Sequence, residues 1–473
     1  MTYFSKTTLF LVLTLTFYAA HAAERTGSLI VPHSITNTTY SSWQAITKDN
    51  QNRILLGGNS RTSHGICKVS VSRLTATGEL DATFGPHGTV YLPLSVGFKD
   101  NSCHAILIDA HNNILVIGSS CITRTKKKCF LIVRFTSEGL LDGSFGPNKN
   151  GIVHILSPFD TTSCECSSAV LDRNGAIILA GTLFQSKDEE LSNFLIARVT
   201  SAGDLDHSFG RDGFNSIPNI QHESADMCDG IVINSKGNLI LGGTSKDTLG
   251  HNCFAAAQLT PQGLLDTSFG TNGNGTMCYN TSGPGYEEVC HAITLDHNEH
   301  IVLAGNSFNT LFNSNFCVTR IIPEGTIDPS FGAGGTVCLP SLAAGLYDGC
   351  YSLAIDHLER IILGGSTNTS NGVDVIATVR LTHAGDVDTS FGDNGIFFMG
   401  CLINDVCHAI MTDAQGSVFI AGLSEDYQRN TNYIIGKVTS EGAIDTSFGK
   451  YDENHQPETA LVLPEEIRRR QIQ

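Results

Sequence analysis

Short apolar runs recur along the chain, separated by turn-forming residues. In one representative stretch they occupy residues 88–94, 104–109, 114–118 and 130–135, are rich in Val, Ile, Leu and Phe, and are punctuated by Gly, Asn, Asp and Ser. Apolar runs of this length are typical of β-strands, and their spacing leaves no room for a helix of about ten residues or more. Each such unit therefore predicts four short antiparallel strands.

The third run of a unit is apolar without alternation, as at residues 177–180. A strand with one solvated face alternates apolar and polar side chains, whereas a strand covered on both faces does not. The pattern thus predicts that the third run is a middle strand in sheets that stack on one another.

One motif, Gly-x-[Leu/Ile/Val]-Asp-x-[Ser/Thr]-Phe-Gly, follows the fourth run and occurs seven times. Its phenylalanines are spaced 61, 64, 60, 62, 60 and 57 residues apart and are Phe84, Phe145, Phe209, Phe269, Phe331, Phe391 and Phe448. A fixed period of this size indicates a solenoid or a propeller. Four short strands repeated seven times predict an all-β fold, a seven-bladed β-propeller built from repeats of about 60 residues.

The residue types of the motif suit a tight turn. Its first Gly can adopt a positive φ, its Asp can accept hydrogen bonds from the residues just downstream, and its Phe gives about 1.5–3 kcal/mol when buried. We expect the Asp to pair with a side chain eleven residues before the Phe, because Arg suits a forked carboxylate contact. These partners are Arg73, Arg134, Arg198, Gln258, Arg320, Arg380 and Lys437. The alternative is a calcium or ligand loop present in seven copies.

The first run occurs eight times, once more than the other runs. The extra copy is either residues 27–32 or residues 459–464, at opposite ends of the chain. The simplest use of a spare strand is to close the ring, so that the two ends of the chain share one blade and no edge stays open. The sequence does not decide which copy completes the blade.

The motif and its flanks resemble the bacterial delta-60 repeat. The shared pattern is Arg-x-x-x-x-Gly-x-[Leu/Ile/Val]-Asp-x-[Ser/Thr]-Phe-Gly, preceded by Asp-x-x-x-x-[Ile/Leu/Val]-[Leu/Ile/Val]-x-[Ala/Gly/Ile]-Gly, and it covers nearly the whole chain after residue 22. The resemblance implies a β-propeller of bacterial origin and implies no catalytic residue, since no general activity is established for the family. The chain departs from the pattern in an eroded turn at Asp109 and in its abundant cysteine.

Composition and the N-terminal residues indicate an exported protein. The net charge of −17 argues against nucleic acid and anionic membranes, which need clustered basic surface. Lys6, the apolar run 7–20 and the sequence Ala20, His21, Ala22 fit a signal peptide at residues 1–22. No other run is long enough to span a membrane. We expect residues 23–464 to form one propeller domain and residues 465–473 a tail, in a monomer exported through the Sec pathway to the periplasm or the outside.

Fifteen cysteines are present, and exported chains can form disulfides. Six occupy one repeat position, where the first repeat has Trp43; they are Cys103, Cys166, Cys228, Cys290, Cys350 and Cys407. One interpretation of this set is a ring of small buried side chains. We predict four disulfides, Cys278–Cys290, Cys338–Cys350, Cys401–Cys407 and Cys121–Cys129. The first two require that the first and second runs of a repeat be neighbouring strands of one blade, because bonded cysteines have Cα atoms about 4.4–6.8 Å apart.

Acids and histidines flank the six cysteines. They predict a polar ring at one face of the propeller, made of Asp100, His104, Asp226, Glu288, His291, Asp348, Asp405 and His408. Acid, Cys and His could bind zinc only if several blades contributed, because one repeat supplies too local a cluster. We therefore assign no metal ligand.

No sequence signature of catalysis is present. A Gly-x-Ser-x-Gly elbow, His-Glu-x-x-His, a phosphate loop and a CxxC pair are all missing from the sequence. The favoured hypothesis is a non-catalytic exported scaffold that binds a protein or a glycan and needs no cofactor. The alternative is a metal-dependent hydrolase or lactonase with its site at the central channel.

Overall fold

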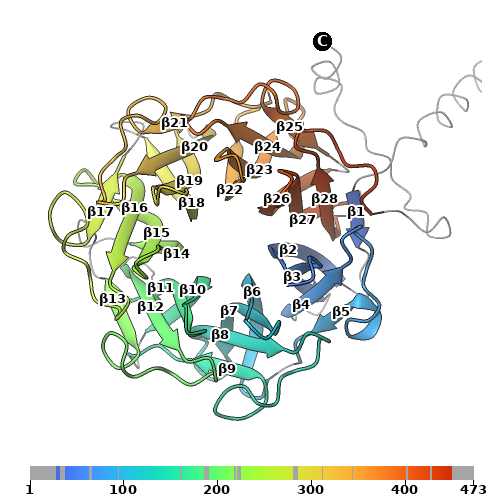
Figure 1. Ribbon diagram of the computed structural model, residues 1–473, viewed down its shortest axis with the longest axis vertical. Coiled ribbons are helices and arrows are strands. Elements are labelled where there is room, and N and C mark those ends of the chain that lie inside the picture. Colours follow the sequence, from blue (N-terminus) through green and yellow to red (C-terminus); the bar gives the residue numbers. More distant parts are fainter. Residues whose placement is uncertain are drawn as a thin grey trace, which may run out of the picture.

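The computed structural model describes residues 28–31, 38–62, 67–93, 95–159, 162–185, 191–217, 220, 225–280, 286–311, 313–343, 345–400, 403–426 and 429–449. Its regular elements are 28 strands and one short 3-10 helix, η1 (Pro86–Gly88). The strands form seven four-stranded antiparallel blades around a central axis (Figure 1). The predicted all-β, seven-bladed propeller is confirmed.

The first four blades follow one another along the chain. Blade 1 contains β2 (Thr38–Lys48), β3 (Ile54–Thr62), β4 (Cys67–Leu74) and β5 (Thr89–Tyr91). Blade 2 contains β6 (Phe98–Ile108), β7 (Ile114–Ile122), β8 (Lys128–Phe135) and β9 (Ile152–Ile155). Blade 3 contains β10 (Ser163–Leu171), β11 (Ile177–Phe184), β12 (Ser192–Val199) and β13 (Phe214–Ile217). Blade 4 contains β14 (Met227–Ile233), β15 (Leu239–Lys246), β16 (Asn252–Leu259) and β17 (Thr276–Tyr279).

The last three blades complete the circle. Blade 5 contains β18 (Glu287–Leu295), β19 (Ile301–Phe308), β20 (Ser314–Ile321) and β21 (Thr336–Cys338). Blade 6 contains β22 (Asp348–Ile355), β23 (Ile361–Asn368), β24 (Asp374–Leu381) and β25 (Ile396–Met399). Blade 7 contains β26 (Asn404–Thr412), β27 (Val418–Glu425), β28 (Thr431–Val438) and, as its outer strand, β1 (Ser28–Val31). No helix in these described segments is long and apolar enough to cross a bilayer.

Each blade begins with the second run of a repeat and ends with the first run of the next. The second runs form the inner strands, which surround the central axis in Figure 1. The first runs form the outer strands, for example β17 beside β16. The expectation that the first and second runs of one repeat are neighbouring strands is therefore wrong. These two runs belong to adjacent blades and lie on opposite edges of them.

The N-terminal strand completes the seventh blade. Strand β1 pairs antiparallel with β28, in a register that sets Ser28 opposite Gly436 and Val31 opposite Tyr433. In Figure 1 the β1 arrow lies beside β28 at the junction between the two ends of the ring. Residues 459–464, the other copy of the first run, lie outside the described residues. The spare N-terminal copy thus closes the ring.

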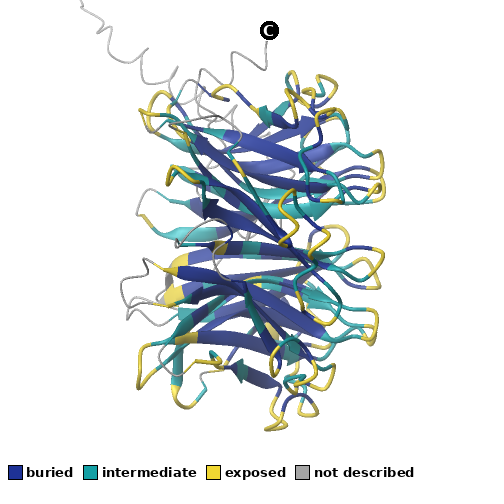
Figure 2. Ribbon diagram, turned by 90° about the vertical axis from the view of Figure 1, so that its left-hand side faces the viewer, coloured by how far each residue is buried: buried dark blue, intermediate teal, exposed yellow. Residues whose placement is uncertain are grey.

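The core lies between the faces of adjacent blades. Ile54, Leu55 and Leu56 of β3 are all fully buried, although successive side chains of a strand point to opposite faces. This confirms that the third runs are covered on both sides, and Figure 2 shows the buried strands between exposed loops. Trp43 of blade 1 is also fully buried and stacks on Tyr433 of blade 7, with ring centroids 3.9 Å apart. The single Trp therefore packs at the point where the ring closes.

The repeated motif is a hydrogen-bonded turn. Asp142 accepts hydrogen bonds from the backbone and hydroxyl of Ser144 and from Nε of Arg134, at 2.7 Å for the last contact. The Arg134 guanidinium lies 4.3 Å from the centroid of the Phe145 ring. The same Asp contact recurs at Arg73, Arg198, Gln258, Arg320, Arg380 and Lys437. The predicted pairing is confirmed, and these carboxylates are occupied by protein donors.

The motif also joins adjacent blades. Nη1 of Arg134 donates to the carbonyl of Ser201 in the next blade at 2.8 Å. The N–H of Gly146, the last residue of the motif, donates to the carbonyl of Ala202 at 2.8 Å. Each turn therefore stabilises both its own loop and the contact with the following blade.

Candidate functional site

All seven inner strands carry a β-bulge at the same repeat position. In β6 the pairing with β7 jumps from Cys103 to Ala105, so His104 is left without a partner in the ladder. A bulge redirects a side chain and interrupts the alternation of a strand. We call the seven bulged residues the channel ring: Gln44, His104, Ser167, Asp229, His291, Tyr351 and His408.

The residues beside the bulge explain why it forms there. Cys103 is fully buried, and its Sγ lies 3.8 Å from the carbonyl of Ala105 on the far side of the bulge. Gly118 lies opposite Cys103, and a Cβ on it would come within 1.9 Å of the Ser102 carbonyl. Only glycine permits this approach of the two backbones. The Gly that ends the third run thus allows the bulge, and the bulge places His104 in the channel.

The channel ring lines one cavity. Its volume is about 440 Å³, and all seven ring side chains contribute to its wall. Small-molecule sites in proteins usually occupy about 300–1,000 Å³. Beyond the ring the lining includes Ser168 and Ser352, and also Ile106, Ile231 and Ile410, which are largely buried between the blades. The cavity therefore combines seven convergent side chains with a largely polar surface.

Three ring-bearing side chains follow one another in blades 5 to 7. The rings of His291 and Tyr351 are 5.4 Å apart and inclined at 55°, and those of Tyr351 and His408 are 5.9 Å apart and inclined at 46°. Asp229 precedes His291 in the order of the blades. We call Asp229, His291, Tyr351 and His408 the arc. It forms a continuous surface of ring faces and polar atoms.

The ionisable groups of the ring are shifted towards their uncharged forms. Desolvation lowers the pKa of His291 and of His408 to about 4 and also lowers the pKa of His104. Desolvation raises the pKa of Asp229 to about 8. No Lys or Arg is among the residues that line this cavity. The site is therefore polar but nearly uncharged at neutral pH.

The structure divides the eight residues of the predicted polar ring into two groups. His104, His291 and His408 face the channel. Asp226, Glu288, Asp348 and Asp405 do not, because they lie two residues before a buried Cys and point, as it does, between the blades. Asp226, for example, accepts hydrogen bonds from Ser245 Oγ at 2.6 Å and from the backbone of Ile220 at 3.1 Å.

Asp100 is also outside the cavity. It lies at a separate irregularity of β6, with φ of 50°, and pairs with Lys99 at 3.0 Å. The placement of these five acids in a channel-facing ring was therefore wrong. Sequence reasoning missed Gln44, Ser167, Asp229 and Tyr351. The signal that identifies them is their position directly after the six cysteines or Trp43.

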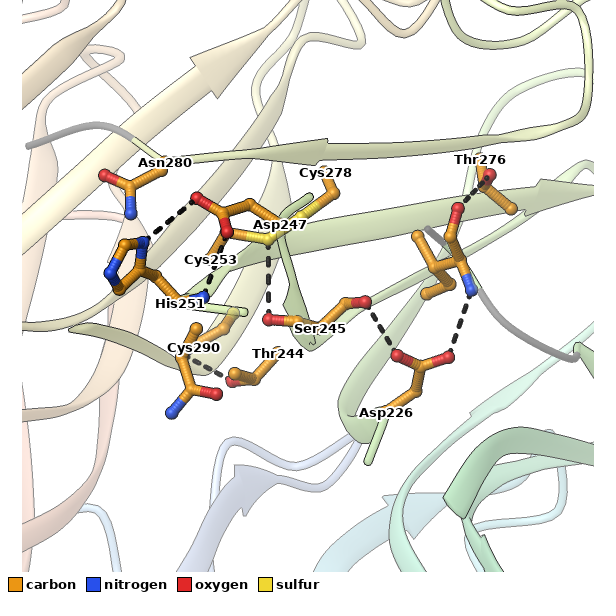
Figure 3. Close-up of a disulfide and its surroundings, with 12 residues drawn as sticks. Asp226, Thr244, Ser245, Asp247, His251, Cys253, Thr276, Cys278, Asn280 and Cys290 are labelled. Carbon is orange, nitrogen blue, oxygen red and sulfur yellow. Dashed lines mark hydrogen bonds and ion pairs between the residues drawn. A yellow bond between two sulfur atoms is a disulfide. The ribbon is translucent and has the colours of Figure 1, made fainter. Parts of the chain in front are cut away.

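The disulfides differ from those predicted. Cys278 bonds to Cys253, with Cα atoms 6.1 Å apart, and Cys338 bonds to Cys317, with Cα atoms 4.1 Å apart. Figure 3 shows the first of these bonds, with Cys290 apart from it and close to Thr244. The pairings Cys278–Cys290 and Cys338–Cys350 are wrong because each joins an outer strand to the inner strand of the next blade.

The remaining cysteines of the described residues are thiols. Cys121 and Cys129 are free, since the register sets them opposite Lys128 and Ser120, so their predicted bond is wrong. Cys407 is a buried free thiol, and Cys401 lies outside the described residues. The six cysteines at the common repeat position are all buried and free, which confirms their interpretation as small core side chains.

One group of potential metal ligands occurs away from the cavity. The potential ligand atoms of Asp296, Glu359 and His383 all lie within 4.8 Å of one another. No other such group occurs in the described segments. Asp296 already accepts a hydrogen bond from His300 at 2.8 Å, and Glu359 pairs with His297. These residues are in turns of blades 5 and 6. The channel histidines do not form such a group.

Two segments of the chain match a known protein family. Residues 237–269 and 360–391 match a family described as "Domain of unknown function (DUF5122) beta-propeller". No curated protein matches the chain.

Solved structures are similar at low sequence identity. A protein of unknown function from Dyadobacter fermentans has 9% identity and a TM-score of 0.43, with 87% of this chain and 98% of that one covered. A polysaccharide lyase described as a PL25 ulvan lyase has 10% identity and a TM-score of 0.47, over 86% and 97% of the chains. A microbial sialidase, Hz136, has 9% identity and a TM-score of 0.41, over 81% and 73%. Likenesses at this level say nothing about activity. The two matched segments lie in two of the seven repeats, so these repeats are similar to those of a β-propeller family, in agreement with the resemblance to the delta-60 repeat.

Proposed function

We propose that the protein is an exported, non-catalytic binding propeller that holds part of a glycan in its central channel. The observation that carries this proposal is the channel ring, in which each of seven blades contributes one bulged side chain to a single cavity of about 440 Å³. Binding sites commonly contain a few convergent polar groups in a concave space, and this cavity has such groups from all seven blades.

The hydrogen bonds of the ring favour binding over catalysis. Ser167 donates its hydroxyl proton to the carbonyl of Cys228, and not to a histidine. His104 is within 2.9 Å of Ser102 Oγ, but this serine is outside the lining of the cavity. Nucleophilic catalysis needs a nucleophile and a base in contact within the site. The ring residues are thus arranged for contact with a ligand, with no such pair among them.

A metal-dependent hydrolase remains the alternative, and the ligand geometry supports it less. Zinc sites need several ligand atoms around one ion. The group of three potential ligands in the described residues is Asp296, Glu359 and His383, outside the cavity.

The shape of the cavity suits a glycan ligand better than a protein ligand. The cavity is a small concave space, and its wall offers hydroxyl, carboxyl, amide and imidazole groups beside aromatic faces. Export is consistent with the two disulfides, which form in oxidising compartments. The segment 1–22 would be removed as a signal peptide before the protein functions.

The test is a glycan-array screen of the protein produced without residues 1–22. We expect the Tyr351→Ala variant to lose binding to the glycans that the natural protein binds. The His207→Gln variant, which changes a side chain on the exposed surface, should keep that binding. Stoichiometric zinc or calcium together with turnover of a bound glycan would overturn the proposal in favour of the hydrolase. Absence of binding to any glycan would also overturn it.

A further inference from the structure

We propose that the arc recognises an uncharged, hydroxyl-rich sugar ring and discriminates against anionic and cationic sugars. This inference rests on the proposed function and names the ligand class of the same site. It is carried by three features of the cavity: the polar atoms that lack full hydrogen bonding, the missing counter-charges and the ring faces of the arc.

The imidazole nitrogens that lack full hydrogen bonding lie in the arc. Nε2 of His408 is buried and has no hydrogen-bond partner among the described residues. His291 Nε2 has one long contact of 3.4 Å, to Nδ2 of Asn306. A buried polar atom without a partner costs free energy, which a ligand hydroxyl can recover. These two histidines on either side of Tyr351 therefore define where hydroxyl groups should bind.

The opposite side of the ring is already engaged. Nε2 of Gln44 donates to Ser42 Oγ at 2.8 Å, His104 contacts Ser102, and Ser167 donates to the Cys228 carbonyl. These residues keep their polar groups bonded to neighbouring parts of the protein. The asymmetry of hydrogen bonding thus favours the arc as the recognition surface.

The cavity provides no fixed charge for an ionic ligand. Its lining lacks Lys and Arg, and Asp229 and the three histidines are shifted towards neutrality by desolvation. The nearby charges of Lys128 and Glu165 pair with each other. A charged sugar would lose its hydration without gaining a counter-ion, which is costly. A hydroxyl group can both donate to an imidazole nitrogen and accept from a protonated carboxyl group.

The ring faces of the arc suit the C–H face of a sugar. His291, Tyr351 and His408 line the cavity and follow one another, with ring centroids 5.4 and 5.9 Å apart. The residues directly after the ring are small in several blades, and include Ala105, Gly230, Ala292 and Ala409. A pyranose carries hydroxyls on its rim and C–H groups on its faces, which matches the polar atoms and the ring faces of the arc.

Isothermal titration with four trisaccharide probes tests the inference. Cellotriose and chitotriose are uncharged, trigalacturonate is anionic, and the trimer of glucosamine is cationic. We expect at least one uncharged probe to bind about tenfold or more tightly than either charged probe, a difference of ~1.4 kcal/mol. Tyr351→Ala and His408→Gln should each weaken this binding by about tenfold or more, whereas His207→Gln should not. Circular dichroism and thermal melting verify the fold of each variant, and His408→Gln keeps the test valid if Tyr351→Ala fails to fold.

The outcomes separate this inference from the proposed function. Tighter binding of trigalacturonate or of the glucosamine trimer, lost in the two arc variants, would overturn the ligand class and leave the channel site in place. Binding of an uncharged probe that both arc variants retain would overturn the arc and the channel site together. No binding of any probe, with a positive glycan array, would overturn the sugar-ring class alone.

Discussion

The backbone N–H of Gly449 donates a hydrogen bond to the carbonyl of Thr77 at 2.8 Å. Gly449 ends the seventh copy of the motif and Thr77 precedes the first, so this contact joins blade 7 to blade 1. It repeats the contact between Gly85 and Glu138, at 3.0 Å, by which blade 1 holds blade 2. The ring is thus closed by the bond that links all other blades, in addition to the pairing of β1 with β28. Closure of the ring leaves no blade without a neighbour on either side, and the remaining sheet edges are the short outer strands.

Ring closure can be tested by two matched truncations. A protein that starts after residue 31 lacks β1 and exposes the edge of β28 from Tyr433 to Gly436. We expect a lower melting temperature and aggregation, measured by calorimetry and light scattering. A protein that ends after Gly449 keeps both closures and should melt within a few degrees of the protein with its full C-terminus. The reverse ranking would show that residues 459–464 supply the closing strand.

The Arg–Asp pairs of the motif should differ in strength with their burial. The Arg380 side chain is 1% exposed and bonds to Asp388 at 2.8 Å. The Arg380→Met change leaves Asp388 with only the more distant Arg360, at 3.9 Å, and should lower the free energy of unfolding by about 3 kcal/mol. The pair of Lys437 and Asp445 is more exposed, so Lys437→Met should cost ~1 kcal/mol or less. Urea denaturation measures both, and equal losses would contradict this ranking.

Asp229 should make the stability of the protein depend on pH. Its pKa is about 8 in the folded protein against 3.8 as the ordinary value, so between these values the folded state binds a proton that the unfolded state does not. Its contribution to stability therefore falls as pH rises from about 4 to 8. The Asp229→Asn variant removes this dependence. We expect the melting temperature of the variant minus that of the natural protein to increase between about pH 4 and pH 8. Above about pH 8 this difference should stay constant. Parallel curves would contradict the raised pKa.

The desolvated channel histidines change the dependence of stability on pH in the opposite direction. The pKa of His408 is lowered to about 4, so the unfolded state binds more protons between pH 6.5 and 4. Stability is lost as pH falls through this window. His408→Gln should reduce that loss, and thermal melts at pH 7 and pH 4.5 should show a smaller difference for the variant than for the natural protein.

Peptide mapping without reduction should recover two bonded pairs, Cys253 with Cys278 and Cys317 with Cys338. The first closes a separation of 25 residues, and its removal by Cys253→Ser together with Cys278→Ser should cost about 3 kcal/mol. Cys290 should react with a thiol reagent only after denaturation, because it is fully buried. Recovery of a peptide that joins Cys278 to Cys290 would contradict the observed strand order.

The sequence predicts the local structure well because each run and each motif contains its own determinants. The strands, the number of blades and the contact of Asp142 with Arg134 all depend on residues close together in one repeat. The position of the blade boundary does not, because an outer run such as residues 276–279 could pair with the strand before it or the strand after it. This one choice accounts for the wrong disulfides at Cys278 and Cys338.

The candidate site was harder to predict because one repeat does not show which face of its inner strand lines the channel. Alternation places Asp226 and Cys228 on one face of the strand and Asp229 on the other. Which of these two faces points into the channel depends on how all seven blades are arranged. The histidines were identified because their chemistry is conspicuous. Gln44, Ser167 and Tyr351 belong to the same set only through their register, which becomes evident when all seven strands are aligned at the bulge.

The pairing of β1 with β28 imposes an order of events on biosynthesis. Ser28 and its partner Gly436 are separated by 408 positions in the chain. Strand β1 therefore has to remain without its partner while the ribosome completes the other blades. Assembly of the last blade is a late, non-local step, of the kind that folds slowly. Under the export proposed above, β1 would also cross the membrane before β28, so the blade that closes the ring could form only after the whole polypeptide had reached one compartment.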